Sequence, residues 1–333
     1  MGVALRDILA PYKHRAGWDG LAGTAAIDAH NALYQFLSII RQADGTPLVD
    51  AEGRVTSHLS GLLFRTTKFL AMGMRPVYVF DGAPPELKAA TIRARRTVRE
   101  EAGRQYAAAV ESGDHAEAYK QARMATRIDA AVIGSAQRLL DLLGVPWLTA
   151  PSEGEAQAAR MAANGAVAYA VTQDYDALLF GAPDLARNIT ISGRRRLHGR
   201  TIVVEPERIR LAEVLEGLGV TRAELIEVGI LVGTDFNEGL RGVGPKTALK
   251  IVREGRFEET VAERMPGFDP GPIRTFFLEP PVTDDYCLDW RAPDVEGLRA
   301  MLGDEYSFSV ERVNAALERI GVTAGQRTLD QWF

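Results

Sequence analysis

The sequence predicts an α/β fold in which a mostly parallel central sheet carries helices on both faces. Three short apolar runs, rich in β-branched or aromatic residues, cover residues 24–28, 76–81 and 168–174 and end in Asp28, Asp81 and Asp174. Helical patterns separate these runs, and strands that alternate with helices usually form parallel sheets. Ligands of such sheets bind beyond the carboxyl ends of the strands. Each of the three acids is therefore expected where chemistry takes place.

The predicted helices follow in order between these strands. Apolar residues at helical spacing predict helices over residues 32–42 and 58–72, between the first strand and the second. The same pattern predicts helices over 128–143 and 155–164, before the third strand. From about residue 221 the pattern is helical and is interrupted by glycine-rich turns. The chain has no solenoid-type repeat and no low-complexity stretch.

Residues 84–127 differ from the rest of the chain. They are rich in Arg, Lys, Glu and Ala and have almost no apolar periodicity. Such a segment forms exposed helices that project from the core, or is partly disordered.

Composition excludes several classes of protein. The chain has 333 residues, of which 46% are hydrophobic, and this is enough for a sizeable core and one large domain or two smaller ones. A single cysteine, Cys287, allows neither an internal disulfide nor a cysteine-based zinc site. No apolar run has the length of a membrane span and no signal peptide opens the chain, so a soluble intracellular protein is expected. The net charge of −5 argues mildly against nucleic-acid binding, unless acids and bases lie in separate places.

Acidic residues gather at the predicted strand ends and next to them. Glu153 and Glu155 open a helix, while Asp174 and Asp176 close a strand. Converging carboxylates raise one another's pKa unless a cation lies between them, and Mg²⁺ prefers oxygen ligands. Two such ions, about 3.5–4 Å apart, can activate water and stabilise the leaving oxygen of a phosphodiester. The alternative for any one acid is helix capping or solvation. The candidate metal ligands are Asp28, Asp81, Glu153, Glu155, Asp174, Asp176 and Asp235.

Basic and aromatic residues follow the acids closely. Lys88, Arg95 and Arg99 share one helical face by their spacing, and Lys88 comes seven residues after Asp81. A cation at that place can bind the scissile phosphate and neutralise developing charge. The alternative is a solvated helix of mixed charge. Tyr34 either stacks on an unpaired base or lies in the core.

A glycine-rich turn opens a later helix. Gly242 and Gly244 would let backbone N–H groups approach a phosphate at the helix N-terminus, and Lys246 and Lys250 add positive charge on the same side. A plain glycine-rich turn is the alternative, because Gly-x-Gly alone is a weak signal.

These features together make the sequence similar to the flap endonuclease family of structure-specific 5′ nucleases, over nearly the whole chain. The motifs that carry the resemblance are Ala26-Ile-Asp28, Tyr34-Gln-Phe36, Thr56-Ser-His-Leu59, Pro76-Val-Tyr-Val-Phe-Asp-Gly82, Ala150-Pro-Ser-Glu153, Asp174-Tyr-Asp176, Gly233-Thr-Asp235, Arg241-Gly-Val-Gly-Pro-Lys246 and Phe277-Leu-Glu-Pro280. The resemblance implies a mixed sheet between helices, a helical arch over the site and a helix–two-turn–helix element. It also implies cleavage of branched DNA, with 5′-3′ exonuclease activity, in lagging-strand replication and base excision repair.

The resemblance further implies a division of the chain. The N-terminal nuclease region would cover 1–100, with the basic arch over 84–127 overlapping it. The internal nuclease region would cover 128–258, with the helix–two-turn–helix near 225–258. Residues 259–325 would complete the same domain, and 326–333 would form a tail.

Roles for single residues also come from the resemblance. Asp28, Asp81, Glu153 and Glu155 would serve mainly one Mg²⁺, and Asp174, Asp176 and Asp235 mainly the other, with Mn²⁺ as a substitute. Lys88 and Arg95 match the catalytic cations of the arch, and Tyr34 matches the stacking position. Further matches to DNA-contacting positions are Arg41, Arg65, Arg187, Gly242, Gly244, Lys246 and Lys250. K⁺ is expected at the helix–two-turn–helix, with carbonyls from residues 238–242.

Two further expectations concern the C-terminal part. Thr56, Phe308 and Arg312 match a pocket for a one-nucleotide 3′ flap, but Tyr306 stands where a lysine is frequent, so the strength of 3′-flap recognition is open. The spacing of the last residues is similar to a sliding-clamp-binding peptide, with packing on the protein's own domain as the alternative. The residues of that peptide are Gln326, Leu329, Trp332 and Phe333.

No basic tail follows, so the chain is more similar to archaeal members of the family. We expect a monomeric cytoplasmic nuclease associated with the nucleoid. A catalytically silent, clamp-bound DNA-binding scaffold is the second hypothesis, although it would not need seven acids. A metal-dependent phosphatase for small molecules is the third, and it leaves the basic arch and the tail unexplained.

Overall fold

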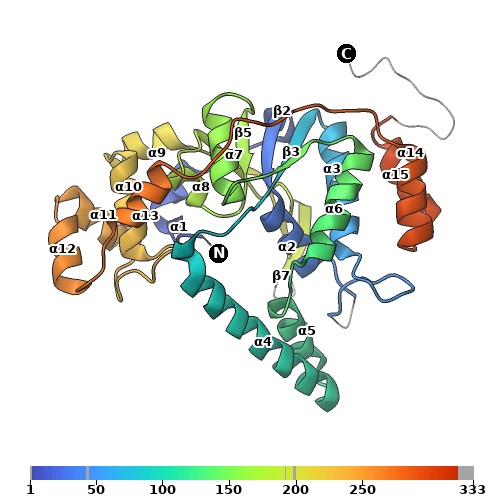
Figure 1. Cartoon of the computed structure of the whole chain (residues 1–333), viewed down its shortest axis with the longest axis horizontal. Coiled ribbons are helices and arrows are strands. Elements are labelled where there is room, and N and C mark those ends of the chain that lie inside the picture. The colour runs from blue at the N-terminus through green and yellow to red at the C-terminus, as the bar shows by residue number, and fades with distance from the viewer. Residues whose placement is uncertain (1, 43–44, 192, 198–199, 322–333) are drawn as a thin grey trace.

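A seven-stranded mixed sheet lies between two layers of helices (Figure 1). The computed structural model describes residues 2–42, 45–191, 193–197 and 200–321. The strand order is β1-β9-β6-β5-β2-β3-β4. Strands β4, β3, β2, β5 and β6 are parallel neighbours, and β9 pairs antiparallel with both β6 and β1 at one edge. The predicted fold class is therefore confirmed.

The strands are short and close in register. Their bounds are β1 His14–Arg15, β2 Gly23–Asp28, β3 Met74–Phe80, β4 Trp147–Thr149, β5 Tyr169–Val171, β6 Asp184–Arg187 and β9 Glu207–Arg210, and a separate ribbon pairs β7 Gly193–Leu197 with β8 Arg200–Val204. The three strands predicted from the sequence are β2, β3 and β5, at the centre of the sheet.

Helices cover both faces of the sheet. Their bounds are α1 Arg6–Leu9, α2 Ala29–Ile39, α3 Ser57–Ala71, α4 Ala89–Ser112, α5 His115–Met124, α6 Ala130–Leu143, α7 Gly154–Ala163, α8 Asp176–Leu179, α9 Leu211–Leu218, α10 Arg222–Val232, α11 Pro245–Arg253, α12 Phe257–Arg264, α13 Gly271–Leu278, α14 Val295–Arg299 and α15 Val310–Glu318. Short helical turns lie at η1 Ala10–Tyr12, η2 Trp18–Leu21, η3 Glu86–Lys88 and η4 Ala300–Glu305. No helix in the described part of the chain is long and apolar enough to cross a membrane.

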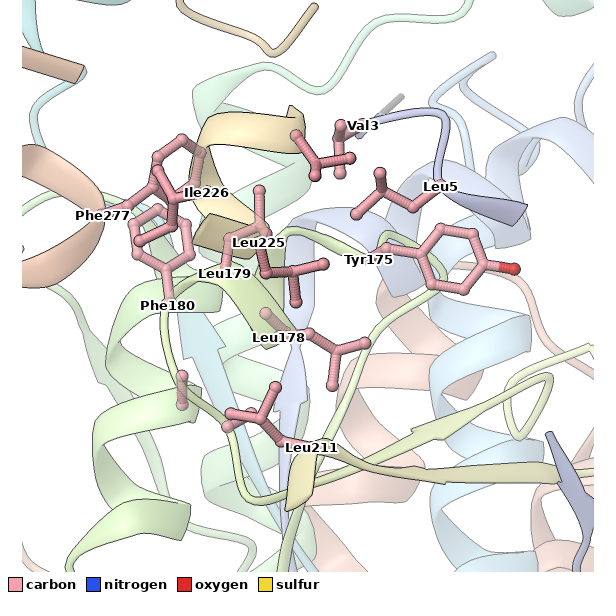
Figure 2. Close-up of a cluster of buried hydrophobic side chains, with 14 of the residues drawn as sticks. Val3, Leu5, Tyr175, Leu178, Leu179, Phe180, Leu211, Leu225, Ile226 and Phe277 are labelled. Atoms are coloured by element: carbon pink, nitrogen blue, oxygen red, sulfur yellow. The ribbon is translucent and has the colours of Figure 1, made fainter. Parts of the chain in front are cut away.

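The core is divided in two because side chains alternate along the strands. Ala26 of β2 contributes to a cluster with α1, α7, α8, α10 and α13, whereas Ile27 contributes to a cluster with α2, α3, α6 and α15. Figure 2 shows the first cluster, in which Val3 and Leu5 from the start of the chain lie near Leu178 and Leu225. The N-terminal segment is thus packed into the core beside the strand ends.

The segment 84–127 forms two helices that project from the body, α4 and α5, in a hairpin (Figure 1). Gly113, with φ of +73°, ends α4 in the left-handed conformation and lets the chain reverse. Only Ala102 and Ala109 of α4 are buried. This explains the absence of apolar periodicity: the two helices pack mainly on each other through small side chains.

Candidate metal-dependent nuclease site

Strand register brings the predicted acids to one edge of the sheet. Asp28 ends β2 and pairs in register with Val79 of β3, so Asp81 lies just beyond the same edge. Ile27 pairs with Val171 of β5, so the segment that leads to Asp174 leaves the sheet there too. Parallel strands that end together place their following residues side by side, as expected.

Helix N-termini hold three of these acids. Asp28 accepts a hydrogen bond of 2.9 Å from the N–H of Asn31, so it caps α2 as well as facing the site. Asp81 Oδ1 accepts a hydrogen bond of 2.7 Å from the N–H of Gly154, the first residue of α7. Glu153 is the N-cap residue of that helix. The capping alternative is thus true of Asp28, and it is compatible with a metal site because the second carboxylate oxygen does not cap.

The start of the chain fixes two more acids. The N–H of Gly2 donates to Asp174 Oδ1 at 2.8 Å, and the N–H of Val3 donates to Asp176 Oδ1 at 2.7 Å. A Cβ atom on Gly2 would lie 2.7 Å from Asp174 Cβ and from Asp176 Oδ1. Glycine is therefore required at position 2 by contact with the acids themselves.

Thr172 and Asn31 connect the acids, and the sequence reasoning missed both. Thr172 Oγ1 lies 2.8 Å from Glu155 Oε1 and 3.3 Å from Asp28 Oδ2. Asn31 Nδ2 donates a hydrogen bond of 3.1 Å to Asp174 Oδ2. The signal was present, because Thr172 directly follows a strand and Asn31 lies three residues after a strand-end acid.

Burial and mutual repulsion shift the carboxylates toward the protonated form. Burial, then repulsion by Asp81 and Asp174, raises the pKa of Asp28 to about 8. Burial also raises the pKa of Asp176 to about 7, against the hydrogen bond from Val3, with repulsion from Asp235 and Asp174 adding to the rise. Desolvation and three neighbouring carboxylates hold the pKa of Glu155 well above its usual range. A cation among these oxygens would relieve the repulsion.

The arch supplies two cations to the same cluster. Lys88 Nζ lies 2.5 Å from Glu153 Oε2 and 3.4 Å from Asp235 Oδ2. Burial opposes the charged form of Lys88, but attraction to Glu153, Asp235 and Asp81 prevails and raises its pKa. Burial still raises the pKa of Glu153 although Lys88 attracts it. Arg95 reaches Asp235 Oδ1 at 2.5 Å from two turns further along α4. The structure thus brings these predicted cations into contact with predicted metal ligands.

The donor set suits a hard divalent cation. As placed, no group of three or more described His, Cys, Asp or Glu side chains has the spacing of a metal site. Their oxygens instead accept from Lys88, Arg95 and backbone N–H groups. All the candidate ligands are carboxylates, four of them have raised pKa values, and Mg²⁺ and Mn²⁺ prefer oxygen ligands. The residues therefore fit such ions once the two arch cations withdraw.

Comparison with known proteins identifies the family. Residues 1–102 match the XPG N-terminal domain and residues 144–235 match the XPG I-region. The chain is 63% identical over 333 residues to flap endonuclease 1 of Methanoculleus marisnigri, and the match covers 100% of both chains. It is 51% identical over 339 residues to flap endonuclease 1 of Pyrococcus furiosus, and this match covers 100% of this chain and 99% of the other. The solved structure of flap endonuclease-1 from Methanococcus jannaschii matches with a TM-score of 0.77 and 38% identity, over 96% of this chain and 98% of the other.

The chain belongs to the flap endonuclease family. It is accordingly a metal-dependent nuclease, as the resemblance implied, and a hydrolase of the XPG type. The small-molecule phosphatase hypothesis is thereby set aside.

The predicted DNA contacts of this flap endonuclease family member lie at different depths. Tyr34 is 45% exposed on α2, so the core alternative is wrong and its ring is accessible. Arg41 is half-buried and donates to the carbonyl of Gly45 at 2.8 Å and to Thr126 Oγ1, and burial lowers its pKa. Burial likewise lowers the pKa of Arg65.

Arg187 is used mainly inside the protein. Its guanidinium donates to the carbonyl of Gln173 at 2.8 and 3.0 Å and to Tyr175 Oη at 2.6 Å, and it lies 4.0 Å from the centre of the Tyr175 ring. Arg187 therefore braces the segment that carries Asp174 and Asp176. Its direct contact with DNA stays a prediction.

The residues expected at a 3′-flap pocket come from α3 and the C-terminal helices. Thr56 is buried before α3, and Phe308 packs against the second core cluster. Arg312 lies 5.1 Å from the centre of the Phe64 ring and donates to Ser60 Oγ at 3.3 Å. Tyr306, where a lysine is frequent, is covered by the guanidinium of Arg54 at 4.6 Å.

The helix–two-turn–helix candidate consists of α10 and α11 with the turn between them. Gly242 has φ of +80° and is exposed, and Gly244 is the N-cap residue of α11. Lys246 and Lys250 are exposed on that helix, while its other face is buried. This arrangement suits a phosphate, although K⁺ binding stays a prediction. The tail residues Gln326, Leu329, Trp332 and Phe333 lie outside the described residues.

Proposed function

We propose that this protein is a structure-specific 5′ flap endonuclease with 5′-3′ exonuclease activity. It would act on branched DNA, including 5′ flaps and nicked or gapped duplexes, in lagging-strand replication and base excision repair. The observation that carries the proposal is the single network in which carboxylates from β2, β3, α7, the segment after β5 and the segment after α10 meet the arch cations Lys88 and Arg95. Full-length identity of 63% to a flap endonuclease supports it.

Two divalent ions, Mg²⁺ or Mn²⁺, are proposed for this cluster. Asp28, Asp81, Glu153 and Glu155 would hold mainly the first, and the other set, Asp174, Asp176 and Asp235, mainly the second. Such ions supply Lewis-acid stabilisation of the charge that develops on the phosphodiester and activate the attacking water.

The chain's own residues position the scissile phosphate. Lys88 and Arg95 are paired with carboxylates here and carry three and five N–H donors at their ends. When ions satisfy those carboxylates, both side chains become available to phosphate oxygens, so the developing negative charge meets preorganised cations. Tyr34, which is exposed on α2 beside Gln35 and Asn31, would stack on an unpaired base and fix its position.

Duplex DNA is proposed to lie along α11. Exposed Lys246 and Lys250 and the N-terminus of α11 offer positive potential on one side of that helix, and K⁺ bound by carbonyls of residues 238–242 would add to it.

The test is cleavage of a labelled double-flap substrate with Mg²⁺ and with EDTA. We expect one main product, cut near the base of the 5′ flap, with Mg²⁺ and none with EDTA. Single-stranded DNA of the same sequence is the control for structure specificity. Binding without any cleavage at saturating Mg²⁺ would establish instead the catalytically silent scaffold, which is the alternative function.

A sliding clamp is proposed as the protein partner of residues 326–333. Support comes from the residue types alone, with Leu329, Trp332 and Phe333 as the hydrophobic anchors. Removal of 326–333 should leave cleavage of short flap substrates intact and abolish stimulation by the clamp. The double change Trp332→Ala with Phe333→Ala should weaken clamp binding by about 30-fold or more, as measured by calorimetry. A lower melting temperature with unchanged clamp affinity would mean that these aromatics close the protein's own core.

The proposed location is the cytoplasm, in association with the nucleoid of an archaeal cell, as a monomer. A fluorescent fusion that does not overlap DNA stain would contradict this location.

A further inference from the structure

A pocket of about 500 Å³ lies between α2 and the arch helix α5, next to the acidic site. Tyr34, Ser38 and Ile39 of α2 form one wall, and Tyr119, Arg123 and Met124 of α5 form the facing wall. Its volume falls within the range of about 300–1,000 Å³ that is usual for small-molecule pockets. None of the residues named so far as metal ligands or arch cations lines it.

Apolar surface in this pocket is exposed. Ile39, Tyr119 and Met124 are 41%, 36% and 43% exposed, although large hydrophobic side chains usually lie in the core. Single exposed apolar residues need no explanation, but three around one hollow form a surface on which a flat ring can pack.

Polar atoms without partners also line the pocket. Ser38 is 8% exposed, and neither its hydroxyl nor the buried Nε of Arg123 has a hydrogen-bond partner within the described part of the chain. Buried polar groups are nearly always hydrogen-bonded, so two unpaired donors in one pocket indicate a ligand with acceptor atoms.

The charge of the pocket is positive. Among the described residues, Lys120 and Arg123 line it, and no carboxylate does. This is unusual in a chain with 44 acidic and 39 Lys or Arg residues, and it favours an anionic ligand.

Hydrogen bonds connect the pocket to the acidic site. Gln35, which also lines it, accepts from Thr190 at 2.6 Å and donates to Asn31, and Asn31 donates to Asp174. Gln173, directly before Asp174, lines the pocket too. A group bound here is therefore a near neighbour of the proposed reaction centre.

The geometry points to a subsite for one unpaired nucleotide of the DNA substrate, with the base between Ile39, Tyr119 and Met124 and its phosphate at Arg123. This inference rests on the proposed function, because it takes branched DNA as the substrate. A nucleotide matches all three properties: a flat ring, hydrogen-bond acceptors and a negative charge. Tyr119 and Arg123 would then be specificity-determining residues, because they distinguish a nucleotide that carries a base from an abasic one.

The test combines changes in the enzyme with abasic substrates. Double-flap substrates carry an abasic site at the first, second or third unpaired nucleotide, and KM and kcat are measured for wild type, Tyr119→Leu and Arg123→Gln. For wild type, one of the three abasic sites should raise KM by between about 5-fold and 150-fold, which is the usual range for one stacked base. Tyr119→Leu should raise KM on the intact flap and lose most of its sensitivity to that abasic site.

Two further variants separate binding from folding. Ser38→Ala removes a hydroxyl that no atom of the described residues satisfies, so it should raise KM while the melting temperature stays equal or increases. Arg104→Gln, on the exposed face of α4 beside Glu101, is the control for Arg123→Gln and should leave KM unchanged.

Wild type that is insensitive to all three abasic sites, or Tyr119→Leu that keeps the full sensitivity, would overturn the subsite. In either case, normal cleavage of intact flaps by wild type would leave the proposed function standing, so the two failures are distinguishable.

Discussion

The sheet edge and the arch meet at one cluster of charges but are built in opposite ways. At the edge, backbone N–H groups of Gly2, Val3 and Gly154 hold carboxylates, and the strands beneath them are buried. In the arch, Lys88, directly before α4, and Arg95 within it reach the same cluster with long side chains, and the only buried residues of α4 are two alanines.

This difference separates two tasks. Ligands for metal ions must be placed closely, which the body provides through short hydrogen bonds and a packed core. Cations that first pair with carboxylates and then with phosphate must be able to change partners. An element with few buried apolar contacts opens at lower free energy cost than the core, so the arch is suited to that change.

The largest effect should follow from loss of a ligand held by the body. Asp174→Ala removes the acceptor of both Gly2 and Asn31, and we expect single-turnover cleavage to fall by more than about 10³-fold, or about 4 kcal/mol of transition-state stabilisation. Binding of flap DNA, measured by fluorescence anisotropy, should persist because the basic contacts remain. Asp284→Ala, at an exposed acid paired with Arg160, is the control. Cleavage near the wild-type rate at saturating Mg²⁺ would contradict the assignment of Asp174.

A cation from the arch should matter next. Lys88→Ala should lower the single-turnover rate by about 10²-fold, with a small change in the dissociation constant, because a preorganised charge acts mainly in the transition state. Arg96→Ala removes a cation from the same helix that is paired with Glu100 in solvent, and it should be close to wild type. If Lys88→Ala changes only the dissociation constant, Lys88 is an ordinary phosphate contact and the division of tasks is wrong.

Low pH should destabilise the body of the protein through protonation of His58. Burial lowers the pKa of this histidine to about 4, against attraction from Asp129, and its Nε2 contacts Ser135 Oγ at 2.7 Å. Because the folded pKa lies below the unfolded value, the unfolded chain takes up the proton first, and stability is lost as pH falls from about 6.5 toward 4. Between pH 7 and pH 5 the wild type should lose about 2 kcal/mol more free energy of unfolding than His58→Gln.

Chemical unfolding at several pH values measures this difference. His14→Gln, at an exposed histidine paired with Glu213, should follow the wild-type curve. Parallel curves for His58→Gln and wild type would mean that His58 is protonated in the folded protein.

The smallest effect is expected on the outside of the arch. Glu101→Gln removes the partner of Arg104 in an exposed pair, and such pairs contribute little, so the free energy of unfolding should not change measurably. Ala109→Asp places a charge at the buried contact of the hairpin instead, and should lower protection of α4 amides from hydrogen exchange while α3 stays protected. If Glu101→Gln and Ala109→Asp lowered the protection of α4 amides equally, the arch would not open independently of the body.

The sequence allowed the centre of the fold to be predicted but not its edges. β2, β3 and β5 were found because buried parallel strands are apolar runs, and the helices between them keep a helical period. β9 has the sequence Glu-Arg-Ile-Arg and β1 has two residues, so neither has a pattern that distinguishes it from a loop. The exposed helices of residues 84–127 were expected only as an alternative to partial disorder.

Within the site too, features that depend on local sequence could be predicted, whereas contacts between distant residues could not. The acids could be found because each lies at a strand end or helix start that the sequence marks. The contacts of Gly2 with Asp174 and of Arg95 with Asp235 join residues 172 and 140 positions apart, and no local pattern encodes them. The pairing of the arch cations with the carboxylates also depends on the direction in which α4 leaves the body, which no local pattern encodes.

The contact between Gly2 and Asp174 bears on how the enzyme is made in the cell. Gly2 leaves the ribosome long before its partner Asp174, because 172 positions separate the two. During that interval Val3 and Leu5 have no finished core to enter, since the helices that cover them, α8 and α10, do not yet exist. The catalytic centre therefore closes only after α10 and Asp235 have been synthesised, and nuclease activity reports a chain that has folded at least that far.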